Sequence, residues 1–169
     1  AFNDGLAIAQ RLATADPGNA GWQRDLWVSR NKIGEILFAQ GDLSAAINEH
    51  EEGRKIAQKL TIMDAGNADW QRDLSISNNL IGDVLVAQGN LPAALKAFNA
   101  ALAIAQRLAT ADPGNAGWQR DLSVSHDRIG DVLVAQANLP DALKAFNDGL
   151  AIAQRLATAD PGNAGWQRD

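Results

Sequence analysis

Apolar residues recur at the spacing of an amphipathic helix along most of the chain. Between residues 116 and 136 the apolar positions follow one another mainly at intervals of three, four and seven: Trp118, Leu122, Ile129, Val132 and Leu133. Such intervals place apolar side chains on one face of a helix. Asn115, directly before this stretch, is a favourable N-cap. The pattern predicts a helix at about 116–136, the first helix of a pair.

A second helix is predicted after a short polar break. Pro140 stands where proline is tolerated in the first turn, and a stretch rich in Ala and Leu follows to about Thr158. Asp160 precedes Pro161, and proline disfavours helical conformation in the residue before it. The second helix is therefore expected to end near 159, before a turn.

The helical pair repeats along the chain with a period of 48 residues. Trp22, Trp70, Trp118 and Trp166 each open the tetrapeptide WQRD. Residues 70–117 and 118–165 differ at eight of 48 positions, so 40 are identical, and residues 1–25 reappear letter for letter at 145–169. The chain therefore starts and ends at the same phase of the repeat, and because it does not begin with Met, we expect it to be a piece of something longer.

The period predicts an all-α fold in one repeat domain, residues 1–169. It divides into a partial repeat at 1–21, full repeats at 22–69, 70–117 and 118–165, and the start of another at 166–169. First helices are expected at about 20–40, 68–88 and 116–136, and second helices at about 1–16, 43–64, 91–111 and 139–159. Neither helix of a pair can bury its apolar stripe alone, so stability must come from stacking pair on pair.

The middle repeat resembles the tetratricopeptide repeat. Seven positions agree in residue type with the pattern of that family, which has a glycine in the first helix and alanines and an aromatic residue in the second: Ile81, Gly82, Leu85, Gly89, Ala94, Phe98 and Ala101. The usual repeat has 34 residues, and the 14 added here lengthen each helix by about two turns. The resemblance implies a right-handed superhelical solenoid of antiparallel helix pairs, of a long variant found in bacteria.

The glycine in each first helix is expected to have a packing role. Glycine within a helix costs about 1 kcal/mol relative to alanine. Gly34, Gly82 and Gly130 are tolerable if they allow the two helices of a pair to approach closely. The first repeat departs most from the family pattern, with His50 in place of the aromatic residue and Ala65 in place of the closing proline.

The resemblance also implies a partner-binding surface. In the family the first helices line the concave face, and positions three before and one after the glycine commonly meet a bound peptide. Those positions here are Asn31, Glu35, Asn79, Asp83, Asp127 and Asp131. Carboxylates and amides, rather than Lys, disfavour a clamp for a peptide's terminal carboxylate and favour a partner with Lys or Arg. A solvated polar face without a binding role is the alternative.

Charge and composition remove several other classes of function. Fifteen Lys and Arg against twenty Asp and Glu give a net charge of −5, which argues against nucleic acid as a partner. The chain has no cysteine, which fits a reducing compartment, and the cytoplasm is expected. No apolar run is long enough to span a membrane, and no signal peptide pattern opens the chain.

Candidate residues for catalysis or metal binding favour structural roles. His50 and His126 have no second ligand at metal-like spacing. The serines of the first helices have no paired base nearby: Ser75, Ser77, Ser123 and Ser125. We therefore expect no enzyme activity, cofactor or metal. The repeated tryptophans are interpreted as packing residues, whereas Trp27, present once, is the candidate for an exposed contact.

Two functions follow from this interpretation. The first is a protein–protein interaction scaffold that presents a concave, mildly acidic groove to a partner protein or peptide. The alternative is a structural array that associates with itself, because identical ends let chains stack head to tail, with Trp166 buried against a neighbour.

Overall fold

The computed structural model describes residues 2–160 and has seven helices and no strand in that range. The helices are α1 (Phe2–Ala15), α2 (Ala20–Ala39), α3 (Leu43–Met63), α4 (Ala68–Ala87), α5 (Leu91–Ala111), α6 (Ala116–Ala135) and α7 (Leu139–Ala159). The all-α class is confirmed, and each described helix end lies within one residue of its predicted position. The prediction for Trp166 falls outside the described residues.

Recurring polar residues fix where the first helices begin. The Asn115 side chain accepts a hydrogen bond from the Trp118 backbone N–H at 3.1 Å. Asn19 and Asn67 cap α2 and α4 in the same way. In the preceding turn the Asp112 carboxylate accepts a hydrogen bond from the Gly114 N–H at 3.1 Å. These side chains satisfy backbone donors that a helix start leaves unpaired, so the turn sequence sets the helix boundary.

A residue with left-handed backbone conformation follows the end of each first helix. Gly41 and Gly89 have φ angles of +82° and +75°, and Ala137 adopts φ +60° at the same position of the third repeat. A side chain in this region costs roughly 1 kcal/mol, whereas glycine adopts it freely. The third repeat therefore stores some strain at this turn.

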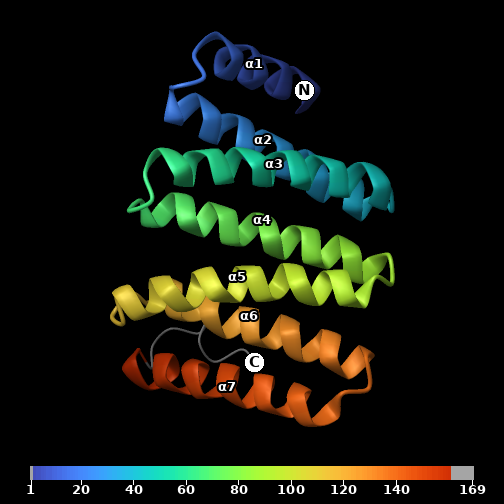
Figure 1. Cartoon of the computed structure of the whole chain (residues 1–169), viewed down its shortest axis with the longest axis vertical. Coiled ribbons are helices and arrows are strands. Elements are labelled where there is room, and N and C mark those ends of the chain that lie inside the picture. Colours follow the sequence, from blue (N-terminus) through green and yellow to red (C-terminus); the bar gives the residue numbers. More distant parts are fainter. Residues whose placement is uncertain (1, 161–169) are drawn as a thin grey trace. The chain divides into compact units, whose positions relative to one another are not determined.

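The helices form two compact units, Ala1–Asn90 and Leu91–Asp169. In the first unit α1, α2, α3 and α4 follow one another as antiparallel neighbours, and each packs against the next (Figure 1). Ala9, Ala13 and Leu26 form a buried cluster between α1 and α2, flanked by Leu6, Trp22 and Ile56. Trp22, the first residue of a WQRD segment, thus packs against the preceding second helix, α1, as expected for a packing residue.

In the second unit α6 packs against both α5 and α7. Its buried cluster contains Ala105 and Ala109 of α5, Leu122 of α6 and Ile152 of α7. Trp118, Leu102 and Leu156 pack against this cluster. Small alanines thus allow the helices to approach, and branched residues fill the space between them.

Two of the three first-helix glycines lie directly against the second helix of their own pair. A Cβ atom added at Gly130 would lie 2.6 Å from Cε1 of Phe146, and one at Gly34 would lie 2.5 Å from Cε1 of His50. Real Cβ atoms do not approach other atoms so closely, so any larger residue at either position would force the facing ring to move. The predicted packing role is confirmed for Gly34 and Gly130, and for the buried Gly82 it stays a prediction.

Candidate partner-binding surface

The six candidate positions lie on the first helices, α2, α4 and α6. They recur every 48 residues, as the series 31, 79, 127 and the series 35, 83, 131. Members of a series share their place in the repeat but differ in burial. Each therefore has to be judged from its own surroundings.

Asn31 is buried inside the α2–α3 pair and does not lie on an accessible surface. Its Oδ1 lies 3.1 Å from Nδ1 of His50, and its Nδ2 donates a hydrogen bond to the Trp27 carbonyl oxygen at 3.1 Å. The expectation that Asn31 meets a partner is wrong in this structure. Because His50 replaces the apolar ring found in the other repeats, its nitrogen needs a polar partner, and Asn31 provides one.

The other two members of this series are partly buried. Asp127 packs against α7, where a Cβ atom at Gly149 would lie 2.7 Å from its Oδ1. Glycine at position 149 thus makes room for the carboxylate of Asp127. Asn79 of α4 is half-buried as well. This series is therefore largely engaged in helix packing.

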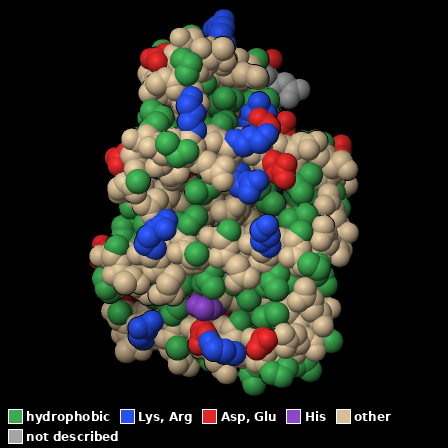
Figure 2. Space-filling model, viewed as in Figure 1, with side chains coloured by type: hydrophobic (Ala, Val, Ile, Leu, Met, Phe, Trp, Pro, Cys, Tyr) green, Lys and Arg blue, Asp and Glu red, His purple; other side chains and the backbone are tan. Residues whose placement is uncertain are grey.

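The second series carries the accessible acidic groups. Glu35 and Asp131 are exposed, whereas Asp83 is half-buried. Figure 2 shows one face of the molecule, on which Lys and Arg side chains are spread among apolar and polar ones and Asp and Glu side chains lie at separate points. Of the six predicted residues, Glu35 and Asp131 are the ones that present open carboxylates.

Trp27 is buried rather than exposed, so its prediction as a surface contact is wrong. The residue is 7% exposed, and its indole Nε1–H donates a hydrogen bond to Oγ of Ser77 at 2.8 Å. This bond joins the first helices of two successive repeats, α2 and α4. Trp27 has no counterpart in the other repeats, so the repeat pattern carries no information on whether this position is buried.

The Arg and Asp of WQRD link successive repeats by an ion pair. Arg24 Nε donates to Oδ2 of Asp73 at 2.7 Å, and Arg24 Nη2 donates to Oδ1 at 3.3 Å. The hydrogen bond to Asp73 raises the pKa of Arg24. Asp73 is buried, so its charge needs this partner. The 48-residue recurrence of the Arg and Asp of WQRD is the sequence signal that could have predicted this pair.

Three of the four candidate serines donate hydrogen bonds to backbone carbonyl oxygens. Ser123 Oγ donates to the Gly149 carbonyl oxygen at 2.9 Å, which ties α6 to α7. Ser77 Oγ donates to the Asp73 carbonyl oxygen while accepting from Trp27. Ser125 Oγ donates to the carbonyl oxygen of Asp121 at 2.9 Å. Each hydroxyl therefore has a packing or backbone partner.

The histidines and acids do not form a metal site within the described part of the chain. No group of three or more His, Cys, Asp or Glu residues is placed to hold an ion among residues 2–160. His126 is half-buried, and burial lowers its pKa, partly opposed by the nearby Asp148 carboxylate. No helix in the same range is long and apolar enough to cross a bilayer.

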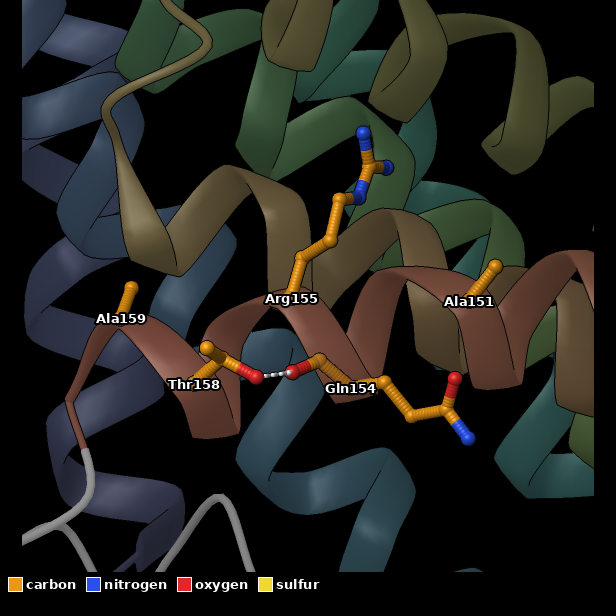
Figure 3. Close-up of a pocket in the computed structure, with 5 residues that line it drawn as sticks. All are labelled: Ala151, Gln154, Arg155, Thr158 and Ala159. Carbon is orange, nitrogen blue, oxygen red and sulfur yellow. Dashed lines mark hydrogen bonds between the residues drawn. The ribbon is translucent and has the colours of Figure 1, made fainter.

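A shallow hollow on α7 offers little chemistry. Figure 3 shows it, lined by Ala151, Gln154, Arg155, Thr158 and Ala159. Thr158 Oγ1 donates a hydrogen bond to the Gln154 carbonyl oxygen at 2.8 Å, so its hydroxyl serves the helix. One guanidinium among small and amide side chains provides no pair of groups for acid–base or nucleophilic chemistry.

Burial of His50 makes the stability of the protein depend on pH. Burial lowers the pKa of His50 to about 4, so the native protein resists protonation that the unfolded chain accepts near pH 6.5. The contribution of neutral His50 to the free energy of unfolding is therefore fully present above pH 6.5, and it is lost as the pH decreases toward 4. Between pH 7 and pH 5 we expect the free energy of unfolding to fall by about 2 kcal/mol.

Urea unfolding of the full chain at the two pH values measures this loss. The His50→Phe variant carries the aromatic residue of the other two repeats and should lose most of the difference between pH 7 and pH 5. An equally steep loss in His50→Phe would assign the pH dependence to other groups.

The described helices define a protein built from repeated antiparallel helix pairs. Residues 72–155 match the model of the tetratricopeptide repeat family. The chain is a tetratricopeptide repeat protein, and repeats of this kind generally mediate protein–protein interaction or assembly. No curated protein sequence matches the chain.

Several solved structures show partial similarity to the chain. BtubC (BKLC) from P. vanneervenii is 12% identical, with a TM-score of 0.39 over 96% of this chain and 90% of that one. MamA is 15% identical, with a TM-score of 0.33 over 93% of this chain and 91% of that one. A chain of the DHF79 filament is 12% identical, with a TM-score of 0.37 over 98% of this chain and 91% of that one. At these TM-scores the similarities say nothing about partners.

Proposed function

We propose that the protein is an interaction scaffold that binds a Lys- or Arg-bearing segment of a partner protein along the first helices of its repeats. The observation that carries this proposal is the pair of exposed carboxylates of Glu35 and Asp131. They occupy the same position of the first and third full repeats, 96 residues or two periods apart. That the first helices present a concave, mildly acidic groove is part of the proposal.

The backbone under both carboxylates is held firmly. Glu35 follows Gly34, which lies against His50, and Asp131 follows Gly130, which lies against Phe146. Close packing one residue away fixes the direction in which each acidic side chain leaves its helix. A partner then meets charges that are already positioned, which lowers the ordering cost of binding.

The sign of the charge selects the partner. Opposite charges accelerate encounter and fix the orientation of a complex more than they add affinity. Asp83, at the same position of the second repeat, is half-buried and interacts with other groups of the protein, so it is not counted among the open acids. The scaffold is thus expected to discriminate by charge and to bind with moderate affinity.

Charge reversal tests this proposal. In fluorescence anisotropy titrations with a short labelled peptide of alternating Lys and Ser residues, the Glu35→Lys/Asp131→Lys variant should bind about tenfold more weakly than the parent chain. The matched control is Asp69→Lys/Asp141→Lys, which changes the net charge equally at two exposed acids in the first turns of α4 and α7. If the control variant binds equally weakly, the effect comes from net charge alone, and the proposal of a defined binding surface loses its support.

A further inference from the structure

A hollow of about 260 Å³ lies between the start of α6, with the turn before it, and the C-terminal part of α7. All of it belongs to the second unit. It differs from the shallow hollow of Figure 3, although Arg155 and Ala159 line both. Its apolar lining consists of Pro113, Ala116, Ile152, Leu156 and Ala159.

One cation stands at this apolar hollow. Arg155 is exposed, and within the described part of the chain it forms no ion pair. Figure 3 shows that Arg155 and Ala159 project from the same side of α7. Gln119 also lines the hollow, but its Nε2 donates a hydrogen bond to the Ala109 carbonyl oxygen at 3.0 Å. The guanidinium is therefore the side-chain group of the lining that is open to a charged ligand.

The corresponding place in the first repeat is bridged by the protein itself. Lys59 of α3 is the counterpart of Arg155, two periods earlier. Its Nζ donates a hydrogen bond to the Pro17 carbonyl oxygen at 2.9 Å, from α3 to the turn before α2. In α7 the equivalent cation is not committed to the turn at Pro113, so it is available to a ligand.

A smaller side chain also leaves more room beside α7. Ala159 stands where α3 has the longer Met63. Leu60, next to this place on α3, is 0% exposed, whereas its counterpart Leu156 is only partly buried. Met63 is 44% exposed although α4 follows it, so a following helix does not cover this position of the repeat.

The electrostatic surroundings favour an anion. α6 begins at Ala116, which lines the hollow, and the first turn of a helix carries partial positive charge. Arg155 adds a full positive charge, and none of the lining residues is acidic. The nearby Asp112 carboxylate accepts a hydrogen bond from the Gly114 N–H and so serves the turn. A carboxylate with an apolar body matches both the charge and the walls.

The volume limits the size of the ligand. A cavity of about 150 Å³ accepts benzene, so about 260 Å³ accommodates a ring with a short chain. A longer peptide would find no second open polar side chain in the lining to hold its backbone. A small molecule is therefore favoured over an extended chain.

We infer that the hollow between α6 and α7 binds a small carboxylic acid with an apolar body, its carboxylate on Arg155 and its body against Ile152 and Leu156. The ligand then joins α7 to the turn before α6, as the bond from Lys59 joins α3 to the turn before α2. Asp131 lies about 22 Å along α6 from Ala116, so this site stands or fails independently of the proposed function.

An amide NMR titration of the full chain with phenylpropionate tests the site. We expect saturable shifts of the Gly114 and Ala159 signals, with a dissociation constant of about 1 mM. Phenylpropylamine has the same ring and the opposite charge, and propionate has the charge without the ring. Each should bind at least about tenfold more weakly. Equal binding of the amine, or no saturable shift of these two signals at about 10 mM phenylpropionate, would overturn the inference.

Two variants of α7 have matched controls on the identical sequence of α1. Ala159→Met introduces the side chain of α3 and should abolish binding, whereas Ala15→Met, outside the hollow, should bind as the parent does. Arg155→Gln should weaken binding about tenfold, and Arg11→Gln should not. Urea unfolding shows whether each variant folds as the parent does. Unchanged binding by Ala159→Met, or equal losses in Arg155→Gln and Arg11→Gln, would contradict the assignment of the site.

Discussion

Replacing Trp27 by alanine is expected to lower the free energy of unfolding by about 3–5 kcal/mol. The indole is 7% exposed, and its removal leaves a cavity between α2 and the helices around it. The substitution also removes the donor to Ser77 Oγ, which links the first helices of two successive repeats. Urea unfolding monitored by circular dichroism measures the loss.

Two further variants serve as comparisons for Trp27→Ala. Ser77→Ala keeps the indole but leaves its N–H without that acceptor, so it should cost about 1–2 kcal/mol. Ile62→Ala removes an exposed side chain of α3 and should change stability by less than about 0.5 kcal/mol. A loss in Trp27→Ala no larger than that of Ile62→Ala would show that the tryptophan does not hold the repeats together.

Gly130→Leu is expected to destabilise the protein by about 1–3 kcal/mol, since overpacking forces neighbouring groups to move. The first added atom would lie 2.6 Å from Cε1 of Phe146, before the rest of the leucine is placed. The aromatic ring fills the α6–α7 interface, so it can move away only by disturbing that packing. We predict a loss of the same size for Gly82→Leu.

Gly5→Leu is the matched control for this substitution. Gly5 also lies inside a helix, but an added Cβ atom there meets nothing within 4 Å. Because leucine has a higher helix propensity than glycine, this variant should be as stable as the parent or slightly more so. A thermal melt of Gly130→Leu that coincides with that of Gly5→Leu would contradict the packing role of Gly130.

The helices could be predicted because their boundary signals recur in every repeat. Asn115 and its two counterparts cap the first helices, and each turn begins with an aspartate that bonds the backbone two residues later. Repetition multiplies such local signals, and local signals control where a helix starts and stops. The close approach at Gly130 was predictable for a similar reason, since a costly residue at a fixed position indicates a steric need.

The accessible surface was harder to predict because burial depends on partners distant in the sequence. Asn31 and Glu35 both occupy positions that the family resemblance assigns to the binding face, yet the buried His50 takes Asn31 as its hydrogen-bond partner. Trp27 is buried because Ser77 of the next repeat accepts its N–H. Both residues belong to the repeat that has drifted furthest, where comparison with the other repeats gives the least guidance.

The contrast between Ile8 and Ile152 shows that local sequence alone cannot predict which residues are buried. The two residues lie in identical stretches of sequence, and only the helix beside them differs. No local pattern can distinguish them. The difference becomes visible once the packing of α6 on α7 is known.

The central functional claim is that exposed acids on the first helices select a basic partner segment. The most direct test is a fluorescence anisotropy titration of the full chain against two labelled peptides, one of alternating Lys and Ser and one of alternating Glu and Ser. We expect saturable binding of the Lys peptide that weakens with added salt, and no saturable binding of the Glu peptide. Equal binding of the two peptides, or saturable binding of neither, would contradict the claim.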